Sequence, residues 1–302
     1  MKKIKQRNQE AESKFRLLRG LNLVEYEKLL HEFDLLIRRK LTLYTLKVKR
    51  RKRFMFSEPP NSLGGSRKKL DFILMYLKEN PNQHYHAHLF GMCQSKVSEW
   101  VSFILPVLEE ALKKLSFMPQ SGTHFVADKS DSDLLIDVTE RIVPRRTDHE
   151  AQKEEYSGKK KMHTIKNLAV TNNCGIIRFI SESYFGKMHD KAIWDNIEFQ
   201  FNDSTLFVDL GFKGVEKEYV NVRIPHKKSK LKELNYGQKR ENKEIGRKRI
   251  TVEHAFGGVK ILKIIRDKIR LKFYEKRDQV FRIASALHNL RLIMRKPILN
   301  ES

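Results

Sequence analysis

The spacing of apolar residues changes near residue 120, and this change constrains the fold more than any other feature of the sequence. Before residue 120, apolar side chains recur every three or four positions, which is typical of helices. After it, they form short alternating or continuous runs, which are typical of strands. We therefore predict an α/β chain in which an all-α region precedes a domain with a mixed sheet and flanking helices.

The first 120 residues predict helices with a linker between them. Residues 15–50 have the apolar spacing of a helix, and residues 57–69 are rich in proline, glycine and serine. Residues 70–115 predict three helices, with breaks at "NPNQ", at "FGMCQS" and near Pro106. A short turn at Gly91, followed by a helix that Gln94 or Ser95 caps, is typical of a helix-turn-helix.

The remaining sequence predicts an order of three strands, a helix, two strands and a long helix. The strands are expected at 133–143, 162–173 and 175–184, with a hairpin turn at 172–175, and then at 204–212 and 220–225. Helices are expected at 189–201, 246–260 and 273–295, with a basic loop at 226–244. The predicted parts are a helical region (1–56), a linker (57–69), a helix-turn-helix domain (70–120), a sheet domain (121–272) and a C-terminal helix with its tail (273–302).

The charge of the chain indicates a polyanionic partner. There are 61 Lys and Arg residues against 37 Asp and Glu, a net charge of +24 that is spread along the whole sequence. Nucleic acid is the first candidate. A membrane is disfavoured because no apolar run approaches 18 residues, and the N-terminus lacks the apolar core of a signal peptide. Cys93 and Cys174 form neither a zinc-binding spacing nor a disulfide framework.

Two aspartates follow apolar runs, and we expect them where strands end: Asp137 after "LLI" and Asp209 after "LFV". Ligands gather at the carboxyl edges of strands in such sheets, so the two carboxylates are expected to converge. Glu253, on the rim of the helix at 246–260, is a candidate third acid. Three acids in a basic protein need a cation between them, and carboxylate oxygens suit Mg²⁺ or Mn²⁺. Two such ions would support phosphodiester cleavage.

Each acid has a simpler interpretation. Asp137 is alternatively a turn residue, Asp209 the end of a strand in an Asx turn, and Asp190 the N-cap of the helix that follows it. On a helix, Glu253 lies four residues after Arg249 and would form an exposed ion pair with it. The alternating histidines at 84, 86 and 88 suggest a metal site less strongly than they suggest part of the helix-turn-helix.

Several ordered motifs resemble bacterial insertion-sequence transposases of the DDE type, in the branch related to the eukaryotic Harbinger elements. They cover about 125–270 and follow the helix-turn-helix in the family's order: "LIDVTERIVPR", "YSGKKKMHTIKNLAV", "GKMHDKAIW", "FVDLGFKGV", "IPHKKSK", "QKRENK" and "RKRITVEHAFGGVK". Several motifs in order are a stronger signal than any one of them alone. The resemblance implies a ribonuclease-H-like catalytic domain.

The resemblance also implies roles for particular residues. Asp137, Asp209 and Glu253 would hold two Mg²⁺ or Mn²⁺ ions, with Asp190 as an alternative second acid, and the ends of a transposon would be cut and joined to target DNA. Arg249 and Lys260 match family positions around Glu253 and would contact phosphates. The sequence departs from the family at Gly246, Val138 and Phe212, where a tyrosine, a glycine and a tyrosine are usual.

The helix-turn-helix would read the terminal inverted repeats of double-stranded DNA. The exposed start of its second helix carries the candidate residues Gln94, Ser95, Lys96 and Ser98, whose alternative role is ordinary solvent exposure. A homo-oligomer on DNA, at the nucleoid of a bacterial cytoplasm, is expected. Two alternatives stay open: a domesticated, non-catalytic DNA-binding protein, and a ribonuclease-H-like endonuclease that cuts without joining.

Overall fold

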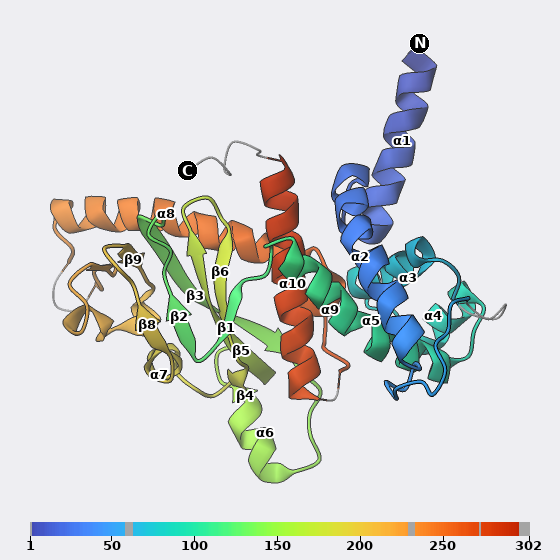
Figure 1. The fold of residues 1–302 in the computed structure, drawn as a ribbon. Coiled ribbons are helices and arrows are strands. Elements are labelled where there is room, and N and C mark those ends of the chain that lie inside the picture. The colour runs from blue at the N-terminus through green and yellow to red at the C-terminus, as the bar shows by residue number, and fades with distance from the viewer. Residues whose placement is uncertain (1, 58–62, 229–232, 272, 296–302) are drawn as a thin grey trace. The chain divides into compact units, whose positions relative to one another are not determined.

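The computed structural model describes residues 2–57, 63–228, 233–271 and 273–295 (Figure 1). They divide into two compact units. The helical unit comprises Met1–Met118, Lys260–Asp267 and Gln279–Met294, and the sheet unit comprises Pro119–Val259, Lys268–Asp278 and Arg295–Ser302. No helix in the described ranges is long and apolar enough to cross a membrane.

The prediction that residues 15–50 are helical is confirmed as far as Leu43, with a break that divides the segment into two helices, and is wrong beyond it. Gly20, with φ +77°, separates them, and Asn22 begins the second with a reciprocal capping box to Glu25. The helices of this unit are α1 (Lys2–Arg19), α2 (Leu23–Leu43), α3 (Ser66–Glu79), α4 (Gln83–Phe90), α5 (Gln94–Lys114), α9 (Lys263–Arg266) and the C-terminal part of α10 (Tyr274–Arg295).

The predicted break near Pro106 is wrong, because α5 continues through this residue. Pro106 is exposed, so the amide hydrogen bond that proline cannot make would be lost on the solvent side. The buried side of α5 carries Trp100 and Phe103, whose rings meet edge to face with centroids 6.1 Å apart. Of the predicted linker, residues 58–62 lie outside the described residues, and α3 begins within it at Ser66.

Helices α4 and α5 form the predicted helix-turn-helix. Gly91, with φ +65°, ends α4 in the left-handed conformation, and α5 begins three residues later at Gln94. The three histidines belong to α4, as the simpler interpretation held. His86 is buried, with its Nε2 3.1 Å from the carbonyl oxygen of Phe72, and burial lowers the pKa of His86 to about 4. His84 and His88 are exposed.

The sheet unit contains a mixed sheet that, within the described residues, has the strand order β1-β6-β5-β3-β9-β10, with β4 and β7 also pairing with β5. A separate two-stranded sheet pairs β2 with β8. Figure 1 shows α8 running beside the main sheet. The strands are β1 (Gln120–Gly122), β2 (His124–Val126), β3 (Asp133–Ile142), β4 (Tyr156–Ser157), β5 (Met162–Asn172), β6 (Ile177–Ser181), β7 (Tyr184–Phe185), β8 (Glu198–Gln200), β9 (Thr205–Phe207) and β10 (Val222–Arg223). The helices are α6 (His149–Glu155), α7 (Asp190–Asp195), α8 (Tyr236–Lys260) and the start of α10, with short 3-10 helices at Leu210–Phe212 and Val215–Lys217.

Two sequence predictions about this unit are wrong. The helix predicted over 189–201 ends at Asp195 as α7, because Ile197, Phe199 and Phe201 alternate with polar residues and pack into the core from β8 and its flanks. The basic loop predicted at 226–244 ends early, because α8 begins at Tyr236, ten residues before the predicted start. Residues 229–232 of that loop lie outside the described residues.

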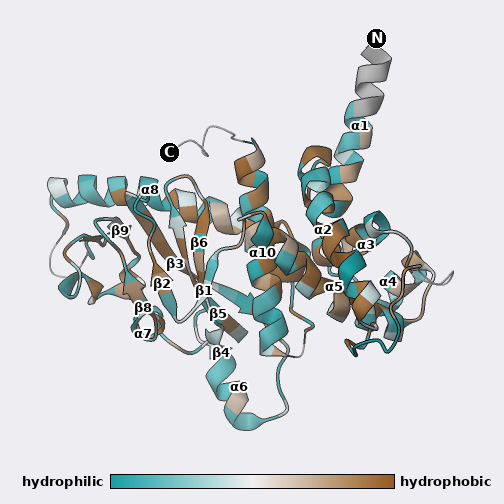
Figure 2. Ribbon diagram, in the orientation of Figure 1, coloured by the Kyte–Doolittle hydropathy of each residue, from teal (hydrophilic) through white to brown (hydrophobic). Residues whose placement is uncertain are grey.

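One face of the main sheet carries the apolar core of the unit. Leu134 and Ile136 of β3 alternate into a cluster that includes Trp194, Phe199 and Phe212. The opposite face is tied to α8, because Lys248 of α8 pairs with Asp133 and lies 5.7 Å from the ring centroid of Phe207. Figure 2 shows the apolar strands in brown and much of α8 in teal. The side chains of alternate β3 residues therefore face either the apolar core or α8.

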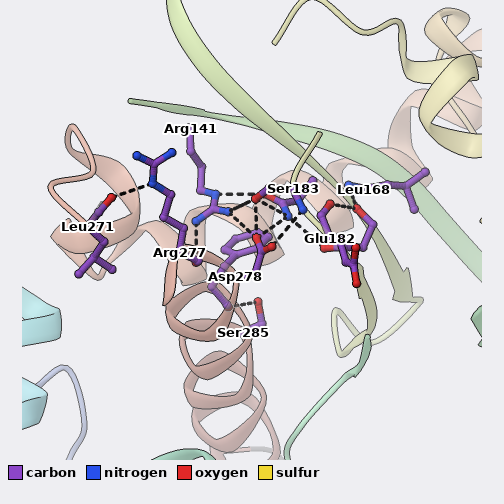
Figure 3. Close-up of polar contacts among 11 residues, drawn as sticks. Arg141, Leu168, Glu182, Ser183, Leu271, Arg277, Asp278 and Ser285 are labelled. Carbon is purple, nitrogen blue, oxygen red and sulfur yellow. Dashed lines mark hydrogen bonds and ion pairs between the residues drawn. The ribbon is translucent and has the colours of Figure 1, made fainter. Parts of the chain in front are cut away.

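A buried arginine joins β3 to the beginning of α10 (Figure 3). Nη2 of Arg141 donates to Oδ1 of Asn167 at 2.7 Å, and Nη1 donates to the carbonyl oxygen of Arg277 at 3.1 Å. Asp278 lies 3.4 Å from Nη2 and accepts hydrogen bonds from the backbone and hydroxyl of Ser183. Burial lowers the pKa of Arg141 to about 10, and the charge of Asp278 opposes this shift.

Gly186, in the motif "GKMHDKAIW", lies against backbone that cannot yield to a side chain. A Cβ there would lie 2.7 Å from the carbonyl oxygen of Glu155 and 2.8 Å from that of Thr164. We expect Gly186→Ala to destabilise the sheet unit by about 1–3 kcal/mol in urea unfolding, because the strands must shift to make room. Gly158→Ala is the matched control, since its Cβ meets no atom within 4 Å. Equal stability of the two variants would contradict this prediction.

Candidate active site

Asp137 lies on β3, and Asp209 lies just beyond the end of β9, the neighbouring parallel strand. Leu135 of β3 is in register with Phe207 of β9, and each aspartate lies two residues further along its strand direction. The expectation that Asp137 stands at a strand end is wrong, because β3 continues to Ile142 and pairs there with β5. β9 is the strand that stops, and Asp209 follows it as the cap of a 3-10 helix.

The two carboxylates are oriented in the same way. Oδ1 of Asp137 accepts a hydrogen bond from the backbone N–H of Val138 at 2.8 Å, and Oδ1 of Asp209 accepts one from the N–H of Leu210. This leaves both Oδ2 atoms facing one nitrogen, Nη2 of Arg249, at 3.9 Å and 3.4 Å respectively. The Asx turn that was the alternative for Asp209 is not the bond that the structure shows, because its Oδ1 accepts from the next residue, Leu210, and not from the N–H two residues on. This bond leaves Oδ2 of Asp209 facing Arg249.

Arg249 is held at this position by charge. Its side chain is 16% exposed, and among the described residues its Nε–H has no hydrogen-bond partner. The exposed Arg249–Glu253 pair expected from helical spacing is not the arrangement that the structure shows, because Arg249 points to the sheet acids instead. An arginine that lacks bidentate hydrogen bonds to either carboxylate is a loosely bound cation.

Burial raises the pKa of Asp137 to about 6. Arg249 and the N–H of Val138 act in the opposite direction, whereas the negative charges of Asp209 and Asp190 add to the rise. Ionised Asp137 therefore lies in a region where negative charge is concentrated and poorly solvated. A nearby cation would stabilise the ionised form of such a carboxylate.

Asp190 lies near this pair but has its own partner. Nζ of Lys166 is 3.0 Å from Oδ1 of Asp190 and 3.6 Å from Oε1 of Glu140. A Cβ at Gly211 would lie 2.7 Å from Oδ2 of Asp190, which places this carboxylate against the turn that follows Asp209. The interpretation of Asp190 as an N-cap is wrong, because His189 is the N-cap and Asp190 is the first residue of α7.

Glu253 is exposed on α8, four residues beyond Arg249. Within the ranges that the structure describes, no three His, Cys, Asp or Glu side chains are close enough together to hold a metal ion. The structure thus brings Asp137 and Asp209 together but does not complete a three-carboxylate group with Glu253 or Asp190. Lys260, the other candidate on this helix, is its last residue and is half-buried.

The residues at the start of α5 have different surroundings. Ser95, Lys96 and Ser98 are exposed, while Gln94 is half-buried and donates a hydrogen bond to the side chain of Gln83. Nζ of Lys96 is 2.7 Å from Oε2 of Glu99. This end of α5 is therefore accessible to a groove of DNA, and Val97 and Trp100 fix the helix from its buried side.

The sequence interpretation missed the contact of Arg249 with both acids and the Lys166–Glu140 pair. Glu140 and Lys166 are direct cross-strand partners in the antiparallel β3–β5 register, at positions where opposite charges attract. Opposite charges on neighbouring strands were a signal that could have found this pair, although only once the register was known. No comparable signal existed for Arg249, because its contacts depend on how α8 lies on the sheet.

The donor set fits a divalent cation at one position. Two carboxylate oxygens already converge on a cationic group, and these are the hard ligands that Mg²⁺ and Mn²⁺ prefer. This arrangement supplies two protein ligands. The described residues contain no group of three His, Cys, Asp or Glu side chains that could hold a metal ion. Asp137 and Asp209 are therefore the residues that would hold a divalent cation, which would supply the positive charge that Arg249 provides here.

A mixed-sheet domain that brings two carboxylates together, in a chain that also carries a helix-turn-helix, is the arrangement expected of a nuclease that acts on DNA. Residues 136–289, about half of the chain, match the family model described as DDE superfamily endonuclease, and residues 61–114 match the helix-turn-helix of the same superfamily. The chain belongs to the DDE superfamily endonuclease family.

One curated relative is a probable transposase for an insertion sequence element, IS702, from Microchaete diplosiphon. It is 29% identical over 201 residues, which cover 66% of this chain and 71% of the relative. No solved structure matches the chain significantly.

Proposed function

We propose that the protein is a DNA transposase, which cleaves DNA at the ends of a transposon and joins those ends to target DNA. The single observation that carries this proposal is the convergence of Asp137 and Asp209 on one cationic group, in a chain of the DDE endonuclease family. The similarity to a probable insertion-sequence transposase supports joining in addition to cleavage. The family's helix-turn-helix supports DNA as the substrate.

In this proposal Asp137 and Asp209 hold Mg²⁺ or Mn²⁺, and Glu253 or Asp190 supplies a further carboxylate when DNA is bound. Two such ions would activate an attacking oxygen and stabilise the leaving oxygen of a phosphodiester. Backbone N–H groups of Val138 and Leu210 keep the two carboxylates oriented. Arg249, once displaced from the acids, would bind a DNA phosphate.

The same proposal assigns the start of α5, with Ser95, Lys96 and Ser98, to the terminal inverted repeats of double-stranded DNA. Lys260 is assigned to phosphate contact. We also propose a homo-oligomer on DNA, because two transposon ends must be held for joining, and a location at the bacterial nucleoid, where the DNA lies.

A non-catalytic DNA-binding protein is the second candidate, and one observation favours it. No third carboxylate joins Asp137 and Asp209 in the described residues, which would suit a protein that keeps DNA binding without cleavage. An endonuclease that cuts without joining is separated from a transposase by its products.

The test is an end-joining assay with the full chain, a supercoiled plasmid as target, and duplexes carrying the inverted repeats that flank its reading frame. With Mn²⁺ we expect nicked duplexes and plasmids joined to the labelled duplex, and with EDTA neither product. Asp209→Asn should yield neither product, whereas Asp203→Asn, an exposed aspartate before β9, should yield both. Nicking without joining would support the endonuclease, and specific binding without either product would support the non-catalytic protein.

A further inference from the structure

Residues 44–53 form a short basic hairpin that follows α2, outside the region matched by the helix-turn-helix model. Tyr44 and Arg50 pair as an antiparallel bridge, and the N–H of Thr45 donates to the carbonyl oxygen of Lys49 at 2.9 Å. Nε of Arg51 donates to the carbonyl oxygens of Leu41 and Tyr44, both at 3.0 Å. Arg51 therefore ties the hairpin to the end of α2, so the segment has a defined shape.

The hairpin presents a dense and uncompensated positive charge. The sequence "TLKVKRRKRFMFS" contains no acidic residue, and its five exposed cations are Lys47, Lys49, Arg50, Lys52 and Arg53. Across the described residues, none of these five forms an ion pair with a carboxylate. These like charges repel one another, so the binding of a polyanion would stabilise the hairpin.

The end of α2, which leads into the hairpin, contacts the middle of α5. Nζ of Lys40, near the end of α2, donates to the carbonyl oxygen of Phe103 at 3.1 Å, and Lys69 lies 5.4 Å from the ring centroid of Trp100. The segment after the hairpin then shares a groove of about 430 Å³ with the start of α3, lined by Thr42, Met55, Phe56, Gly65 and Ser66. The hairpin is thus linked to α5 through the end of α2, and to α3 through the segment that follows it.

Two exposed aromatic rings accompany the charge. Phe54 is 57% exposed and Phe56 is 88% exposed, and their rings meet edge to face with centroids 6.4 Å apart. Basic side chains beside exposed aromatic rings are typical of surfaces that contact nucleic acid, where phosphates meet the cations and apolar rings meet sugars or bases. An anionic membrane would also attract this combination.

We propose that the basic hairpin is a second DNA-contacting element, which binds backbone phosphates of duplex DNA beside the segment that α5 reads. The inference rests on the proposed function for its DNA substrate, and it adds a contact that the helix-turn-helix match does not include. DNA is preferred to a membrane because α2, which leads into the hairpin, packs against α5, the helix whose start is proposed to read the DNA groove. Phosphate contacts would fix the register of the helix-turn-helix on DNA.

The test compares two double variants of the full chain that each remove two positive charges. Lys49→Gln with Arg50→Gln changes the hairpin, and Lys113→Gln with Lys114→Gln changes two exposed residues at the opposite end of α5. The probe is a fluorescein-labelled duplex of about 30 base pairs and arbitrary sequence, in EDTA, so that no cleavage occurs. Anisotropy titrations over a range of salt concentrations measure the dissociation constant and its salt dependence, and circular dichroism checks that both variants fold.

We expect the hairpin variant to bind roughly ten-fold more weakly at about 0.1 M salt, with a slope of log K against log salt reduced by about 1.8. The control variant should match the unchanged protein. Equal slopes for the hairpin variant and the unchanged protein, or equal losses in both variants, would overturn the inference. A loss confined to binding of phosphatidylserine vesicles, with duplex binding retained, would overturn it as well. None of these outcomes depends on cleavage, so the proposed function is judged separately by the joining assay.

Discussion

Substitution of Asp137 by asparagine should abolish metal-dependent cleavage and yet stabilise the metal-free protein. Cleavage should fall by about a thousand-fold or more, because a cation ligand that contributes about 4 kcal/mol to the transition state is lost. DNA binding should persist, since the start of α5 and the basic hairpin are unchanged. Residual nicking above a tenth of the original rate would remove Asp137 from the proposed acids.

The expected stabilisation follows from the raised pKa of Asp137. Its pKa is about 6 in the folded protein and near 3.8 in the unfolded chain, so the folded state holds the proton more tightly. The free energy of unfolding therefore falls as pH rises through the window from about 4 to about 6, and the cost persists above it. We expect this loss of unfolding free energy to be about 1–2 kcal/mol. It is less than the full pKa shift implies, because the side chain of Asp137 is 23% exposed. Asparagine removes this cost.

The measurement is urea unfolding in EDTA at about pH 4 and about pH 8. A Trp100→Phe background leaves Trp194 as the one tryptophan of the chain, and Trp194 is buried in the core of the sheet unit. The higher free energy of unfolding of Asp137→Asn should appear at about pH 8 and vanish at about pH 4. Asp203→Asn, at an exposed position, is the control. A variant that is less stable than its parent at pH 8 would show that the contact with Arg249 outweighs the cost of burial.

Removal of the Arg141 side chain should destabilise the sheet unit by about 3–5 kcal/mol. Arg141 is buried (Figure 3). Its guanidinium donates hydrogen bonds to Asn167 and to the carbonyl oxygen of Arg277, and it forms an ion pair with Asp278. Arg141→Ala would leave the Asp278 carboxylate without the positive charge beside it and the carbonyl of Arg277 without this donor, and it would also open a cavity. The loss is large for a domain of ordinary stability.

The control for this prediction is Arg145→Ala, because Arg145 is exposed and its Nε donates to the side chain of Gln152 at 2.7 Å, the one hydrogen bond of its side chain among the described residues. Its effect should stay within about 0.5 kcal/mol. Urea unfolding followed by Trp194 fluorescence measures both variants. Asp278→Asn should recover part of the stability lost in Arg141→Ala, because it removes the stranded charge, and additive losses would contradict the interpretation of a coupled pair.

The sequence alone predicted the order of the main elements. Apolar alternation located β3, β5 and β6, and helical spacing located α10 within one residue of its start. It failed where two patterns compete: the alternating residues 197–201 were absorbed into a helix, and Pro106 was taken as a break although its exposed position lets α5 continue. Local pattern does not decide whether a proline ends a helix or is accommodated within it.

The candidate site was predicted in part. Apolar runs before Asp137 and Asp209 identified two acids that the structure brings together, because parallel strands in register carry equivalent residues to the same place. The position of Arg249 could not be predicted, since it depends on how α8 lies against the sheet, a tertiary contact without a local signature. The same holds for Glu253, which helical spacing places beside Arg249 but which the structure leaves exposed.

The position of Asp137 in the middle of a strand limits which insertions and deletions the chain tolerates. One residue added between Asp133 and Asp137, or between Thr205 and Asp209, would turn the following carboxylate towards the apolar core. The turn at 144–148, which leads from β3 to α6, carries no such constraint. Related chains that differ in length should therefore differ at such turns, and these two five-residue stretches should keep their length.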